Sequence, residues 1–215
     1  MIFTDDTTAA LNFVAALADT VPEASESGED ELATTAQLND LLDAWIYSGR
    51  RDGDARELAE VVAARERLRA LWALDRDAAV VEVNAILAES RAVPRLVRHD
   101  TLDWHIHATS LDAPLAERIL VEAAMALVDV IRADETDRMR ACAADDCTGI
   151  FLDLSKNGSR RFCSTRCGNR MAVRAYRARS TGYAGDDERP PPVHARWGPS
   201  QEVRGISESR VWRDA

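Results

Sequence analysis

The stretch CAADDCTGIFLDLSKNGSRRFCSTRC, residues 142–167, decides the fold of the carboxyl-terminal part of the chain. It holds all four cysteines of the protein as two close pairs separated by fifteen residues: Cys142 and Cys147, then Cys163 and Cys167. Such pairs suit a metal, because Zn²⁺ takes four thiolates tetrahedrally and close pairs cost little loop-closure entropy. The segment is too short to bury much apolar area, so metal binding would hold it together. The spacing therefore predicts a Zn²⁺ site with these four ligands.

The two pairs are expected on different elements. Cys142 and Cys147 flank a turn rich in Asp, whereas Cys163 and Cys167 are one helical turn apart, with Ser164 as a helix cap. This order predicts a small treble-clef-like or ribbon-like finger whose closed, four-ligand metal is structural and not hydrolytic. Two disulfides, free thiols, or a thiol switch that ejects zinc on oxidation are the alternatives.

A basic helix is predicted directly after the cysteines. The sequence GNRMAVRAYRARS, residues 168–180, places its arginines three or four residues apart, so that they share one helical face. Arginine forks bind phosphates in pairs, and a helix of this width can enter the major groove of DNA. Asn169 could read adenine or cap a loop, and Val173 and Tyr176 are expected to point toward the metal site. The residues predicted to bind nucleic acid are Arg160, Arg161, Arg166, Asn169, Arg170, Arg174 and Arg177.

Charge is strongly segregated along the chain. The net charge of −10 by itself argues against a general nucleic-acid binder. However, residues 1–135 carry a net charge of −15, whereas residues 155–179 hold eight basic side chains and no acidic one. This polarity predicts two modules with different partners. The alternative is a basic helix that docks on the protein's own acidic body.

The first 135 residues are predicted to be mostly helical. Leucine, valine and alanine recur at helical spacing, and the resulting helices are expected near residues 5–20, 34–47, 54–74, 76–89 and 113–133. Residues 94–100 and 103–109 alternate in polarity and predict a β-hairpin, with Trp104, Ile106 and Ala108 on one face. The expected fold class is mostly α (α+β), with a helical domain over 1–135, a zinc finger with an arginine-rich helix over 138–180, and a flexible, proline-containing tail over 181–215.

Several functional classes are disfavoured. No apolar run approaches the ~20 residues of a membrane span, and the amino terminus lacks the features of a signal peptide, so a cytoplasmic protein without membrane contact is expected. No Gly-rich phosphate loop, nucleophile elbow or His-rich metal motif is present in the sequence, so no catalytic residue and no enzyme activity is predicted.

Two further groups of residues have more than one interpretation. His105 and His107 could hold a metal together, but an exposed polar face opposite Trp104 and Ile106 is the preferred interpretation. Trp45, together with the other tryptophans of the helical region, Trp72 and Trp104, is expected in the core. These rings could instead line a ligand pocket between the helices and the hairpin.

The carboxyl-terminal segment resembles the CGNR zinc-finger family. The resemblance covers about 40 residues and lies in Cys142, Cys147, the FLDLS of residues 151–155, the RRFCS of 160–164, and the CGNR of 167–170. In that family the finger follows a helical region called the ABATE domain, described as a putative stress-induced transcription regulator, and residues 1–135 match its layout. The family tends to carry Phe-Val-Asn-Thr near its start, whereas here Phe13-Val14 is followed by two alanines. The resemblance implies a DNA-binding regulator.

The leading hypothesis is a transcription regulator in which an acidic helical domain senses a small-molecule ligand or forms a homodimer, and a zinc-stabilised finger binds DNA. A single finger offers little contact area, which is why specific binding would require a dimer. The alternative is a protein-interaction module whose arginine face docks on an acidic partner.

Overall fold

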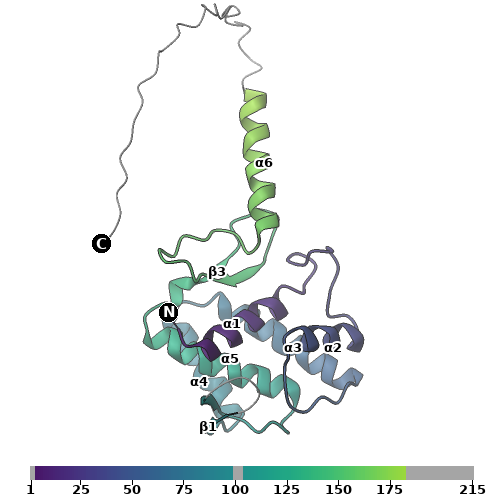
Figure 1. Ribbon diagram of the computed structural model, residues 1–215, viewed down its shortest axis with the longest axis vertical. Helices are drawn as coiled ribbons and strands as arrows, with labels where there is room; N and C mark the ends of the chain where they lie inside the picture. The colour runs from purple at the N-terminus through teal and green to yellow at the C-terminus, as the bar shows by residue number, and fades with distance from the viewer. Residues whose placement is uncertain (1–2, 99–103, 183–215) are drawn as a thin grey trace, which may run out of the picture. The chain divides into compact units, whose positions relative to one another are not determined.

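The computed structural model describes residues 3–98 and 104–182 of the 215-residue chain (Figure 1). Residues up to Tyr176 belong to one compact unit; of the second unit, 177–215, the structure describes the end of one helix. The predicted tail lies outside the described residues from 183 onward. The elements are α1 (Asp5–Ala18), α2 (Thr35–Ala44), α3 (Ala55–Trp72), α4 (Arg76–Glu89), β1 (Arg95–Val97), β2 (His105–His107), α5 (Leu115–Arg132), the 3₁₀ turn η1 (Thr136–Arg138), β3 (Met139–Ala141), β4 (Ile150–Leu152) and α6 (Thr165–Gly182).

Helix α5 is the centre of the helical region and packs against α1, α3 and α4. Its apolar residues recur at helical spacing, and Leu115, Ile119 and Leu127 are almost completely buried. Leu11 and Leu17 of α1 meet them from the opposite side of the same core. The predicted mostly helical fold class is therefore confirmed.

Local capping explains where the helices begin. Thr34 and Gln37 form a capping box at the start of α2, in which each side chain bonds to the other residue's backbone N–H. Asp54 and Asp75 accept hydrogen bonds from the first turns of α3 and α4. These polar residues stand directly before apolar runs, and so the helix starts could be recognised from the sequence.

The predicted β-hairpin is present, but its faces are exchanged. β1 pairs antiparallel with β2, with Leu96 opposite Ile106. His105 is buried and His107 is half-buried, whereas Trp104 is 63% exposed and Ile106 is also exposed. The prediction of an exposed histidine face is therefore wrong. A period of two separates the faces of a strand but does not say which one is buried, and here polar partners lie beneath the hairpin.

The tryptophans also differ in their environments. Trp72 is buried, as predicted, and its indole N–H donates to the backbone oxygen of Arg140 at 3.3 Å. Trp45 is 38% exposed and Trp104 still more so, which means that the prediction of a core position is wrong for these two.

A second hairpin, β3–β4, begins the finger. β4 is buried throughout and packs against α1 (Figure 1). Ile150 and Leu152 are part of the same apolar core as the helices. The finger is thus anchored to the helical region by a buried strand. Within the described chain, no helix has both the length and the hydrophobicity that crossing a bilayer requires.

Candidate metal centre and nucleic-acid interface

The four cysteine sulfurs converge on one point. All four Sγ atoms lie within 4.8 Å of one another. The Sγ atom of Cys163 is 3.7 Å from that of Cys147 and 3.7 Å from that of Cys167. A tetrahedral Zn²⁺ with Zn–S bonds of about 2.3 Å holds its sulfurs about 3.8 Å apart. Two of the sulfur–sulfur distances match this value, and the four predicted ligands lie close enough together to share a single metal ion.

The β3–β4 turn positions the first pair. Cys142 follows β3, and its N–H donates to the backbone oxygen of Gly149 at 2.7 Å. The N–H of Gly149 in turn donates to the Sγ of Cys147 at 3.3 Å. A Cβ at position 149 would lie 3.0 Å from the Sγ of Cys163 and 3.0 Å from a carboxylate oxygen of Asp19. Glycine is needed here because the backbone passes so close to the sulfurs.

The start of α6 positions the second pair. The Ser164 hydroxyl accepts a hydrogen bond from the N–H of Cys167 at 3.2 Å, which is the geometry of a helix N-cap. The N–H of Cys163 donates to the Sγ of Cys142 at 3.5 Å, linking the two pairs. Thiolates at a helix N-terminus are favoured by the free N–H groups and the helix dipole. The sequence prediction of Ser164 as a cap is confirmed.

The chemistry of the cluster fits a divalent metal. Burial and the neighbouring thiols raise the pKa of the Cys163 thiol well above its ordinary value, and burial likewise raises the pKa of Cys147. Four crowded thiols cannot all ionise without a strong compensating charge, which a Zn²⁺ ion would supply. With four protein ligands such a metal would stabilise the fold and leave no position for a reactive water.

Arg170 is turned toward this centre. Its Nη2 atom donates to the Sγ of Cys167 at 3.3 Å and to a carboxylate oxygen of Asp146 at 2.9 Å. Its Nε atom is buried without a hydrogen-bond partner among the described residues. Four thiolates around Zn²⁺ carry a net charge of −2, so a guanidinium in contact with one sulfur stabilises the complex.

Arg174 is paired with the acidic turn of the finger. Its guanidinium is 2.7 Å from a carboxylate oxygen of Asp145 and 2.6 Å from one of Asp146, and its side chain remains 47% exposed. Burial raises the pKa of Asp146, but the hydrogen bonds and charges of Arg170 and Arg174 outweigh it and hold that pKa below its ordinary value. The segment 155–179 contains no acid, and only folding brings these acids to it.

The other predicted nucleic-acid contacts have varied positions. Arg160 lies over the Phe151 ring at 4.6 Å and donates to the backbone oxygens of Phe162 and Cys163. Arg166 donates to the backbone oxygen of Glu26 at 2.6 Å. All of the predicted contacts except Arg170, which is half-buried, are exposed: Arg160, Arg161, Arg166, Asn169, Arg174 and Arg177.

Two apolar residues of α6 do not face the metal centre. Val173 and Tyr176 are both exposed, and the expectation that they point toward the cysteines is wrong.

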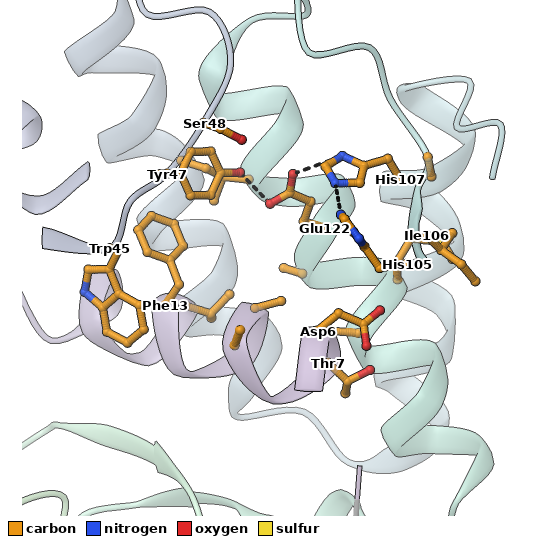
Figure 2. Close-up of a pocket in the computed structure, with 18 of the residues that line it drawn as sticks. Asp6, Thr7, Phe13, Trp45, Tyr47, Ser48, His105, Ile106, His107 and Glu122 are labelled. Carbon is orange, nitrogen blue, oxygen red and sulfur yellow. Dashed lines mark hydrogen bonds and ion pairs between the residues drawn. The ribbon is translucent and has the colours of Figure 1, made fainter. Parts of the chain in front are cut away.

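The histidine pair lies in a different place, beside a cavity of the helical region (Figure 2). The two Nε2 atoms of His105 and His107 are 3.0 Å apart. Among the described residues, the group of three or more ligand side chains that could hold a metal is the cysteine cluster, and neither histidine belongs to it. One carboxylate oxygen of Glu122 lies 3.9 Å from the Nδ1 atom of His107, and the other accepts a hydrogen bond from the Tyr47 hydroxyl. Because Glu122 and Tyr47 come from distant elements, the sequence did not reveal this arrangement.

Comparison with protein families agrees with this geometry. Residues 8–134, more than half of the chain, match the ABATE domain, described as "Putative stress-induced transcription regulator". The chain belongs to the ABATE family. Residues 138–180 match the CGNR zinc finger, as the CGNR of residues 167–170 predicted. No curated protein matches the chain.

Proposed function

We propose that this ABATE-family protein is a transcription regulator that binds duplex DNA through the arginine face of α6, which a zinc site holds in place. The observation that carries the proposal is the basic block of residues 155–179, which holds eight cations and no acid; five of these cations lie on α6, which begins at the cysteine cluster. Phosphate contacts by such a surface supply most of the affinity of nucleic-acid binders. We further propose that it acts in the cytoplasm, by binding and not by catalysis.

The arginines divide into two groups under this proposal. Arg170, in contact with Cys167 and half-buried, stabilises the metal centre. Arg161, Arg166 and Arg174, with Arg177 further along α6, are exposed and would contact phosphates. The pairs of Arg174 with Asp145 and Asp146 do not prevent this, because exposed ion pairs contribute only about 0–1 kcal/mol.

The helical region would regulate DNA binding or bring two fingers together in a dimer. We propose that it senses a ligand or forms a homodimer. A single finger buries roughly 600–1,000 Å² of its own surface on DNA, which is little for specific binding, and a dimer would double that area.

A second candidate function is supported by the same ion pairs. Arg170 and Arg174 already bind carboxylates of the protein's own turn at 2.6–2.9 Å. A surface that selects carboxylates could dock on an acidic protein partner instead of on phosphates.

Fluorescence anisotropy with a labelled duplex over a range of salt concentrations tests the proposal. The triple variant Arg166→Gln/Arg174→Gln/Arg177→Gln should bind DNA much more weakly and reduce the slope of log K against log [salt] by roughly three. The matched control replaces three exposed arginines of the helical region, Arg56→Gln/Arg95→Gln/Arg132→Gln, and should leave both quantities nearly unchanged.

Two results would contradict the proposal. Unchanged DNA affinity in the triple variant, with its zinc content intact, would show that α6 is not the DNA-binding element. Tighter binding of a labelled poly-glutamate chain than of duplex DNA at the same salt concentration would favour the protein-interaction module.

A further inference from the structure

The helical region contains a cavity of about 220 Å³ that metal binding and DNA binding do not use. It lies between α1, α5, β2 and the turn that follows α2 (Figure 2). One water needs roughly 10–15 Å³ of such space, so the cavity has room for on the order of fifteen water-sized groups. A small organic molecule of about ten non-hydrogen atoms would fit.

One end of the cavity is aromatic. The ring of Phe13 lies 4.8 Å from that of Tyr47 in a stacked arrangement and 5.8 Å from that of Trp45 in an edge-on arrangement. Figure 2 shows the three rings grouped on one side, away from the histidines. Trp45 is incompletely buried although it is large and apolar, and so part of its surface is available to a ligand.

The backbone is strained at Ile46, between the two aromatic residues Trp45 and Tyr47 at this end of the cavity. Ile46 has φ of 51°, in the left-handed region that β-branched residues rarely adopt, and its side chain is 85% exposed. The N–H of Tyr47 donates to the backbone oxygen of Leu42 at 2.8 Å, which closes the end of α2 around this residue. Trp45, Ile46 and Tyr47 all line the cavity, and Ile46 is the most exposed of the three. Strain of this kind is common at ligand sites.

The other end of the cavity is polar and organised around Glu122. The Tyr47 hydroxyl donates to the Oε2 atom of Glu122 at 2.7 Å, and the Oε1 atom is 3.9 Å from the Nδ1 atom of His107. Burial, and then the charge of Glu122, raise the pKa of Tyr47 well above its ordinary value, so this phenol stays a donor. Glu122 therefore lies between the aromatic end and the histidines (Figure 2).

The charge of the lining favours a cation. Three carboxylic acids, Asp6, Glu122 and Asp129, line the cavity, and no lysine or arginine is among the described residues that do so. The hydrogen bond between the Nε2 atoms of His105 and His107 requires one N–H and one lone pair, so at least one ring is neutral.

The nearest guanidinium is directed elsewhere. Arg118 lies 5.4 Å from the centre of the Tyr47 ring, but its N–H groups donate to the backbone oxygens of Ser48, Arg50 and Ala113. Arg118 is almost fully buried and does not line the cavity. An anionic ligand would thus meet carboxylates without a lysine or arginine in the described lining to offset them.

We propose that this cavity binds a small organic cation, an amine with an apolar body. The apolar body would lie on Phe13 and Trp45, and the ammonium group would be held by the carboxylate of Glu122 and by the aromatic faces, which attract cations. The proposal names a ligand class for the helical domain that the proposed function treats as a sensor. Only the regulatory role of this ligand rests on the proposed function.

Isothermal titration calorimetry with three probes of one shape but different charge tests the proposal on the full-length, zinc-loaded protein. The probes are 2-phenylethylammonium, 2-phenylethanol and phenylacetate. The cation should bind at least tenfold more tightly than the alcohol, and the anion should bind most weakly. The assay contains no DNA, so its failure is distinct from a failure of DNA binding.

Variants then locate the site. Glu122→Gln preserves the shape of the side chain and an acceptor for the Tyr47 hydroxyl. It should weaken the binding of the cation at least tenfold and change the affinity for the alcohol by less than twofold. Glu117→Gln removes a charge from the same helix outside the cavity and should change neither. In NMR spectra, the cation should shift the indole N–H resonance of Trp45 but not that of Trp72, whose indole N–H is hydrogen-bonded to the backbone oxygen of Arg140.

Any of three outcomes would overturn the proposal: equal affinity for cation and alcohol, tightest binding of phenylacetate, or no saturable binding of any probe at millimolar concentration. If Glu122→Gln does not fold, the NMR shift of Trp45 in the wild-type protein decides, because its absence with the cation would equally exclude this site.

Discussion

The helical region and the finger of this protein are stabilised by different forces. Across residues 3–98 and 104–134 the core consists mainly of leucine, valine, isoleucine and alanine side chains on facing helices, with Phe3, Phe13 and Trp72 among them. The finger has one buried strand, β4, and beyond it relies on four cysteines and on pairs such as Arg174 with Asp146. A region with little apolar area to bury needs another source of stability, and a metal can supply roughly 10–16 kcal/mol.

The two regions are nevertheless joined by specific contacts. Arg69 of α3 donates to the backbone oxygen and hydroxyl of Thr148, and Asp19 accepts a hydrogen bond from the N–H of Ile150 at 2.8 Å. These bonds bring the finger's turn against the helices. We therefore expect substitutions in the metal site to affect mainly the finger, substitutions in the helical core to affect mainly the helices, and substitutions at the contacts between them to have smaller effects.

The largest effect is expected for the metal site. Cys163→Ser should lose the zinc and unfold residues 138–180, because the metal would hold the two cysteine pairs together and β4 is the one short strand there that is buried throughout among the described residues. The helices α1–α5 should persist with a lowered melting temperature, since β4 leaves their core. Metal analysis measures the loss of zinc, and hydrogen exchange measures which segments unfold. Ser159→Ala, an exposed change in the same finger, should alter neither, and a variant that kept one zinc per chain would refute the ligand assignment.

The next largest effect is expected in the helical core. Leu127→Ala should reduce the free energy of unfolding by about 2–5 kcal/mol, because Leu127 is almost completely buried and truncation leaves a cavity. Its zinc stoichiometry should remain that of the wild type. Val81→Ala removes an exposed apolar side chain and should change stability by only about 0.5 kcal/mol. Urea denaturation distinguishes the two variants, and equal losses would mean that the helices do not depend on this core.

The smallest effect concerns the junction and depends on pH. Burial raises the pKa of Asp19 to about 6, against the opposing hydrogen bond from Ile150 and the charge of Arg69. Between about pH 4 and pH 6 the unfolded chain binds fewer protons than the folded one, so the stability contributed by Asp19 falls as pH rises. Asp19→Asn keeps an oxygen for the Ile150 N–H and removes the charge, and should stabilise the protein by on the order of 1–3 kcal/mol at pH 7.5.

The same variant should differ much less from the wild type near pH 4, where Asp19 is protonated in the folded chain and only partly ionised in the unfolded chain. Chemical denaturation at a series of pH values measures this difference. Asp40→Asn, an exposed change on α2, serves as the control. A stabilisation of equal size at both pH values would contradict the explanation by ionisation.

Much of the fold follows from local sequence patterns. Thr34 and Gln37, or Asp75 before α4, mark helix starts because capping acts over three residues. The cysteine pairs predict their own convergence, since each pair is closed by a turn or by one helical turn. By contrast, the burial of His105 opposite an exposed Trp104 could not be predicted, because it depends on Glu122 and Tyr47, which lie far away in the sequence.

By itself, the sequence determined the helices, the hairpin of the helical region, the cysteine ligand set and the separation of negative and positive charge, because each depends on neighbours within a few residues. Only the tertiary structure decided which acids meet the arginines of α6, which hairpin face is buried, and that Phe13, Trp45, Tyr47 and Glu122 surround one cavity. These features arise from contacts between residues up to about a hundred positions apart, which packing selects and local preference does not encode.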